Sequence, residues 1–301
     1  MRARWFAWRG WMLAALGAAV SGCAQNPRHA DAAGFAGGPV SAGTSSASAA
    51  APELASDDQA QAQRLAVALR MVQGGRAAEA LEGPIAEVIA HYEQGPGSEP
   101  GVRYYCARDQ MEALVYLGEA ASRHVQALVL SPTWANAYFY RSSALTNLGR
   151  IAESQAALRK ALALSPWNSL FLAEMGFIYE QQRRFEKSLE LFKQAEAAVE
   201  FSPESMRQLE LAHALRGEGF SLTELHRFDQ AEAKYRHALR LNPSDQRSKN
   251  ELEYIRKKRQ EAKGQGGGLD SAAEDSSRAA AKGVAAVFAR GRGGAGPAAA
   301  H

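Results

Sequence analysis

Residues 135–168 read ANAYFYRSSALTNLGRIAESQAALRKALALSPWN, and the spacing of small and apolar side chains in this stretch recurs along the chain. Pairs of small residues seven apart return at a step of 34 residues, and a fourth pair follows after 43. Such a period indicates stacked copies of one supersecondary unit. Inside each unit, apolar residues recur at i, i+3, i+4 and i+7, which is the spacing of a helix. The pairs are Ala120/Ala127, Ser154/Ala161, Ser188/Ala195 and Ala231/Ala238.

Small side chains are expected where two helices approach closely, because a larger side chain would overpack the contact. Pro132, Pro166 and Pro243 each follow an apolar run, and proline ends a helix because it cannot continue one. We therefore expect an all-α solenoid of helix pairs. A helix at about 246–262 is expected to cap its carboxyl end with a polar outer face.

The pattern resembles the tetratricopeptide repeat, which has small residues at positions 8, 20 and 27, bulky residues at 4 and 24, and proline at 32. The resemblance implies units 101–134, 135–168, 169–211 and 212–245. Arg108 stands at a small position of the first unit, and Glu200 replaces proline in the third. Nine extra residues precede Gly219, and we expect a long helix at about 203–226. Besides the pairs above, the resemblance assigns close helix packing to Ser142, Gly176 and Gly219.

The resemblance also implies a groove lined by the first helix of each unit. Its aromatic strip would bind an apolar or amphipathic peptide. Packing of some of these rings against the preceding helix is an alternative reading. The Lys/Asn/Arg clamp of chaperone-binding members is absent. The groove residues are Tyr105, Asp109, Phe139, Ser143, Asn147, Phe177, Gln181, Arg216, Phe220 and Glu224.

The amino terminus predicts export. Three arginines precede the apolar run 11–20, and this order predicts a signal peptide at 1–22. The apolar run is too short to span a bilayer as a permanent helix. The stretch Val20-Ser21-Gly22-Cys23 resembles the lipobox of bacterial lipoproteins, which implies cleavage before Cys23 and acylation of its sulfur and amine. Ala24 follows, and the resemblance then implies an outer-membrane lipoprotein facing the periplasm. An ordinary cleaved signal with an incidental cysteine is the alternative.

Composition separates the remaining segments. Residues 23–56 carry the anchor and a linker rich in Ala, Gly and Ser, which we expect to be flexible. Residues 57–100 predict a degenerate helix pair. The first helix is expected to end at Gly74-Gly75, and the second is expected to be interrupted at Gly83-Pro84 and to restart there, because proline suits a first helical turn. Residues 263–301, with their glycine and alanine runs, are expected to be a disordered tail.

Charge and cysteine content narrow the function classes. The chain has 35 basic and 32 acidic residues, and removal of Arg2, Arg4 and Arg9 leaves 32 of each. A neutral mature chain without a basic stripe does not predict nucleic-acid binding. The basic run 256–259 is expected to be a solvated helix face paired with Glu251 and Glu253, and contact with acidic lipid or an acidic partner is the alternative. Cys106 is expected to be a buried, inert thiol within a helix, and a reactive thiol beside Arg103 is the alternative.

The sequence contains no His-Glu-x-x-His, phosphate-binding glycine loop or Gly-x-Ser-x-Gly motif, so we expect no enzyme, metal or cofactor. Two functions fit the pattern. The first is a lipid-anchored scaffold of the cell envelope that binds a polypeptide, in the assembly of an envelope or secretion complex. The second is a structural self-association module or an accessory subunit of a cell-wall enzyme.

Overall fold

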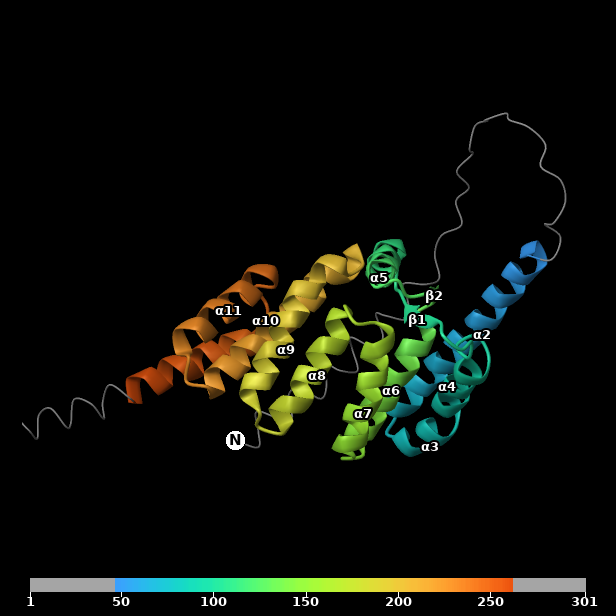
Figure 1. Ribbon diagram of the computed structural model, residues 1–301. Coiled ribbons are helices and arrows are strands. Elements are labelled where there is room, and N and C mark those ends of the chain that lie inside the picture. Colours follow the sequence, from blue (N-terminus) through green and yellow to red (C-terminus); the bar gives the residue numbers. More distant parts are fainter. Residues whose placement is uncertain (1–46, 262–301) are drawn as a thin grey trace, which may run out of the picture.

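The computed structural model describes residues 47–261, and Figure 1 shows them as a curved row of helices. The predicted signal peptide, Cys23 and the tail 263–301 lie outside the described residues. The first helices are α2 (Ala47–Gln73), α3 (Ala77–Glu82) and α4 (Pro84–Gln94). Helix α2 begins inside the segment predicted as a linker, so residues 47–56 are helical and that prediction is wrong for them. Alanines, which have the highest helix propensity, start this helix.

Three helix pairs form the regular stack. They are α6 (Thr133–Asn147) with α7 (Ile151–Leu164), α8 (Ser169–Gln181) with α9 (Phe185–Ala198), and α10 (Glu204–Glu224) with α11 (Phe228–Leu241). A final helix covers 246–261. The all-α, tetratricopeptide-type solenoid is thereby confirmed. The boundary placed at residue 211 falls inside α10, because that helix begins seven residues before it.

Each pair turns through the same backbone motif. The first helix ends two residues before a residue with positive φ, namely Gly149 (75°), Arg183 (58°) or His226 (59°). The next amide then bonds back across the turn, as Arg150 N–H does to the carbonyl of Leu145 at 2.9 Å. This is the arrangement of a Schellman motif, which satisfies carbonyls at the helix end.

The small residues lie at the contacts between helices. Ser154, Ala161, Ser188, Ala195, Ala231 and Ala238 have no exposed surface, and Ala120 and Ser142 are also buried. The hydroxyl oxygens of Ser142 and Ser154 are 2.8 Å apart, and that of Thr146 is 2.7 Å from Ser154. A Cβ on Gly176 would lie 3.0 Å from the ring of Phe192, and one on Gly219 would lie 2.8 Å from the ring of Tyr235. Small residues therefore permit these close approaches.

The segment 101–134 is not a helix pair. It contains β1 (Arg103–Cys106), α5 (Gln110–Ser122) and β2 (Ala127–Leu130), and the strands pair in parallel. Ala127 is therefore a half-buried strand residue, which corrects its prediction as a helix-packing residue. Cys106 also lies in a strand, which corrects its prediction within a helix. Tyrosines and β-branched or aliphatic residues, which pack well on a pleated surface, prevail over the helical period here. We call residues 103–130 the βαβ unit.

The βαβ unit is attached to the extended end of α10 by buried charges. Arg108 Nη1 lies 2.7 Å from Glu210 Oε1, and its Nε lies 3.2 Å from Glu112 Oε2. Tyr116 donates to Glu112 at 2.8 Å, and Ser202 donates to Glu210 at 2.5 Å. The nine extra residues therefore extend α10 to receive the βαβ unit (Figure 1). Ser202 donates to Glu210, and α10 has no side-chain cap at its amino end.

Candidate functional site

The aromatic side chains predicted to line a groove are mostly part of the core. Tyr105 stacks on Tyr116 within the βαβ unit, with ring centroids 5.1 Å apart. Phe139 stacks on Phe171 at 4.9 Å and is 3% exposed. Phe177 is 8% exposed. These three buried rings do not form a continuous exposed strip, which corrects that prediction.

Phe220 differs from the other three aromatic residues. It is half-buried, and its ring meets that of Phe185 edge-on at 6.4 Å. A partly exposed ring on α10 is thus the one member of the predicted strip that a partner can contact without a rearrangement of the core.

The polar residues of the predicted groove divide into two groups. Asp109 accepts a hydrogen bond from Glu112 N–H and caps α5, which lies outside the three regular pairs. Ser143 and Arg216 are buried, and Arg216 Nη1 lies 3.5 Å from Asp245 Oδ2.

The second group lies at equivalent positions near the ends of the first helices. Asn147 on α6 is exposed, whereas Gln181 on α8 and Glu224 on α10 are half-buried. We call these three residues the repeat-face row. Two amides and a carboxylate supply both hydrogen-bond donors and acceptors, which suits contact with the main chain of a polypeptide.

The first helices also contain titratable groups beneath the surface. Burial raises the pKa of Glu174 to about 8, and it raises the pKa of Glu180 well above its usual value. Burial, together with the charges of Arg216 and Arg247, lowers the pKa of His213 to about 3. Glu174 and His213 are therefore mainly uncharged near pH 7, as expected for buried side chains.

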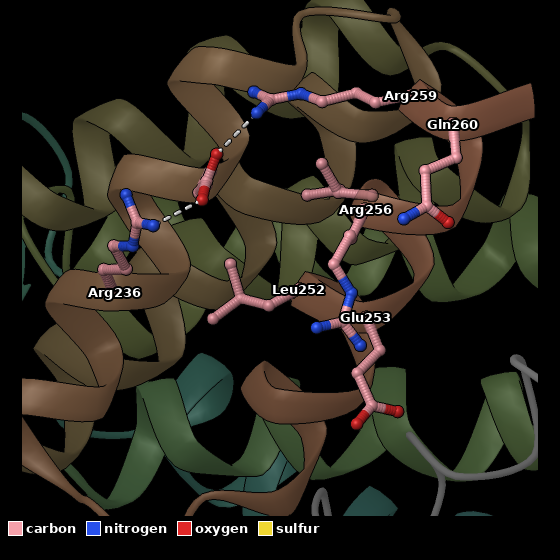
Figure 2. A pocket seen from close by; sticks show the side chains of 8 residues that line it. Arg236, Leu252, Glu253, Arg256, Arg259 and Gln260 are labelled. Carbon is pink, nitrogen blue, oxygen red and sulfur yellow. Dashed lines mark ion pairs between the residues drawn. The ribbon is translucent and has the colours of Figure 1, made fainter. Parts of the chain in front are cut away.

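A pocket of about 450 Å³ lies between α11 and the final helix (Figure 2). Its apolar wall comes from Leu252 and Ile255, and its polar rim comes from both helices. Glu232 lies 2.6 Å from Arg236 and 2.9 Å from Arg259. The lining holds three arginines and two glutamates, so it carries one excess positive charge.

The basic run pairs with acidic residues of two helices. Arg259 pairs with Asp229 and Glu232 on α11, and Lys258 pairs with Glu261 on the final helix. The pocket was not predicted, because the sequence pattern indicated only a capping role for the helix at about 246–262. The signal for it was the opposite charges on α11, one helical turn apart at Glu232 and Arg236.

Within residues 47–261 no group of His, Cys, Asp and Glu side chains is arranged to hold a metal ion. In the same range, no helix combines the length and apolar character needed to cross a bilayer. Cys106 is fully buried, and burial raises its thiol pKa to about 12. Arg103 lies over the ring of Tyr105 and donates to the carbonyl of Ala163. The thiol is therefore inert.

Comparison with known proteins agrees with this fold. Residues 135–166 match the family model of the tetratricopeptide repeat, so the chain contains this repeat. No curated protein sequence matches the chain. Proteins with this repeat typically act as non-catalytic scaffolds for protein–protein interaction, and some bind peptides.

Solved structures with a similar arrangement include three proteins with low sequence identity. PilF of Pseudomonas aeruginosa is 18% identical over 68% of this chain and 71% of its own, with a TM-score of 0.48. MamA of Desulfovibrio magneticus is 13% identical over 67% and 87%, with a TM-score of 0.44. The second tetratricopeptide domain of human RPAP3, in complex with an HSP70 peptide, is 18% identical over 40% and 94%, with a TM-score of 0.36.

Proposed function

We propose that this chain is a lipid-anchored scaffold of the cell envelope that binds a polypeptide on the face of its repeats. The observation that carries the proposal is the periodic stack of α6–α11, which places Asn147, Gln181 and Glu224 at equivalent positions of successive units. A periodic face suits an elongated polypeptide, because each unit can contact the next part of the same segment.

The sequence of the amino terminus supports the envelope location. A signal peptide and the lipobox-like Val20-Ser21-Gly22-Cys23 would leave Cys23 as the acylated first residue. Acyl chains would then attach the repeats to the outer membrane facing the periplasm, and a polypeptide of an envelope or secretion complex would be the partner.

Photocrosslinking in cells tests polypeptide binding. A photoreactive amino acid replaces Gln181 in the repeat-face row, and the matched control carries it at Gln194, which is exposed on α9. We expect position 181 to yield a defined adduct with an envelope polypeptide that position 194 does not yield. Equal adducts from both positions, or none from either, would contradict binding at this face.

Self-association is a second candidate, and a particular surface favours it. Met111, Leu114 and Leu117 on α5 are 55%, 65% and 41% exposed, and they lie three residues apart along the helix. Exposed apolar rows of this kind mark contact surfaces. Sedimentation equilibrium separates the candidates: a dimer that Leu114→Lys converts to monomer supports self-association, and a monomeric wild type removes it.

A further inference from the structure

The two-stranded sheet has an unpaired edge on β2. Arg103 N–H donates to the carbonyl of Gln126 at 2.8 Å, and Ala107 N–H donates to that of Leu130 at 3.1 Å. In this parallel register, residues 126, 128 and 130 direct their backbone groups toward β1. Ala127 and Val129 therefore direct theirs away from it. Among residues 47–261 the sheet contains only these two strands, so no third strand pairs with this edge.

A cavity of about 710 Å³ lies beside β2. Leu128, Val129, Leu130 and Ser131 form one side of it, and residues of α2 and α4, with Pro96, form the others. Leu128 is 44% exposed although it is a large apolar residue. The βαβ unit therefore leaves an apolar strand beside an open space, where another strand can be accommodated.

The remaining walls of the cavity are acidic. Asp57 and Asp58 contribute two carboxylates, and the lining contains no lysine or arginine. Asp58 is held in place, because it accepts hydrogen bonds from Tyr92 and from Ser131, the latter at 2.5 Å. Asp57 lies 3.0 Å from His91 Nε2, and its side chain is 44% exposed. The carboxylate of Asp57 is thus accessible to a cationic side chain.

We propose that an extended segment of a partner polypeptide, with alternating apolar residues and a lysine or arginine, adds to β2 as a third strand. Its main chain bonds to the free N–H and C=O groups of Ala127 and Val129. One of its apolar side chains enters the cavity beside Leu128, and its cation lies at Asp57. This site is separate from the repeat-face row, so either proposal can fail without the other.

Residue 129 gives a specific way to block the edge. Val129→Pro removes the N–H that points away from β1, whereas the pairing with β1 uses the N–H groups of residues 128 and 130. Leu128→Lys is a second variant that keeps every backbone group and places a charge on the edge, which opposes strand addition. Circular dichroism and thermal melting are used to check that each variant folds.

The experiment is a selection of peptides on the full chain. Random 12-residue peptides are selected on the wild-type protein, and those that also bind Val129→Pro are removed. We expect surviving peptides with alternating apolar residues and a basic residue, which bind Val129→Pro and Leu128→Lys at least tenfold more weakly. Asp57→Asn should weaken their binding about tenfold, and N-methylation of alternate peptide amides should abolish it.

Three outcomes would overturn the proposal. The first is that no peptide survives the removal step. The second is that survivors tolerate N-methylation of either set of alternate amides, which means they bind without main-chain pairing. The third concerns hydrogen exchange in the full chain without peptide. It is that the Val129 amide is protected from exchange, and that this protection is lost when residues 24–46 are deleted. That result would assign the edge to a segment of the chain itself.

Discussion

At the scale of single residues, Gly217 has the tightest position among the described glycines. A Cβ at this position would lie 2.1 Å from the ring of Phe192, which is fully buried and cannot move aside. Gly217→Ala should therefore lower the free energy of unfolding by about 1–3 kcal/mol. Gly118→Ala is the matched control, because it lies on α5 with no atom within 4 Å of the added Cβ. The control should gain about 0.5–1 kcal/mol, and urea denaturation of both variants measures the difference.

Glu174 should make stability depend on pH. A buried carboxyl with a pKa of about 8 keeps its proton where the unfolded chain, with a value near 4.5, has lost it. The free energy of unfolding therefore falls as pH rises from about 4.5 to about 8, by at most about 1.4 kcal/mol per pH unit for this one group. Glu174→Gln should match the wild type near pH 5 and melt at a higher temperature near pH 8.

The control for this change is Glu190→Gln on the exposed surface of α9. It should leave the pH profile of the melting temperature as in the wild type. Parallel profiles for Glu174→Gln and the wild type would show that Glu174 does not titrate in this window. Burial is also the main cause of the raised pKa values of Glu180 and Glu218. These two groups should therefore preserve part of the pH dependence of stability in Glu174→Gln.

At the scale of elements, the buried charges decide whether the βαβ unit stays on α10. Arg108→Met leaves the buried carboxylates of Glu112 and Glu210 without their cation, which should cost about 3–5 kcal/mol of unfolding free energy. In this variant, the rate of amide hydrogen exchange should increase more in α5 than in α8. The matched control is Arg150→Met, which breaks an exposed pair with Glu153 and should leave the melting temperature nearly unchanged.

A further variant tests whether the unpaired charges or the lost packing cause the loss of stability in Arg108→Met. The combination Arg108→Met, Glu112→Leu and Glu210→Leu replaces the whole network with apolar side chains. It should recover most of the stability, because a buried ion network is often no stronger than apolar packing of similar volume. A combination as unstable as Arg108→Met alone would show that the hydrogen bonds to Tyr116 and Ser202 are essential instead.

The elements also show how far the sequence could predict this structure. The pairs α6–α7, α8–α9 and α10–α11 follow from the repeated small residues, because helix contacts require them at fixed spacing. The same spacing continues into Ala120, Ala127 and Pro132, where the chain forms a βαβ unit. Arg108 at a position that needs a small residue was the sign of a different structure. Its partner Glu210 lies 102 residues away, so only the folded chain reveals the network.

The candidate site was harder to predict than the fold. Periodicity identifies which residues share a helix face, but it does not say how deeply that face is covered. Phe139 and Phe177 lie on the expected helices and are nevertheless buried. The cavity beside β2 was unpredictable for another reason, since it combines Asp57, His91 and Leu128 from three separate elements.

At the scale of the whole molecule, the proposed acylation of Cys23 would determine where the repeats act. A chain with several acyl groups on Cys23 should incorporate a clickable palmitate analogue and sediment with the outer membrane. The variant Cys23→Ser should incorporate none, because serine lacks the sulfur that the first acyl groups require. Cys106→Ser is the matched control, since that thiol is buried in β1 and should contribute no label. Label that persists in Cys23→Ser, or an unlabelled wild type released in soluble form, would favour an ordinary cleaved signal peptide and remove the membrane anchor from the proposed function.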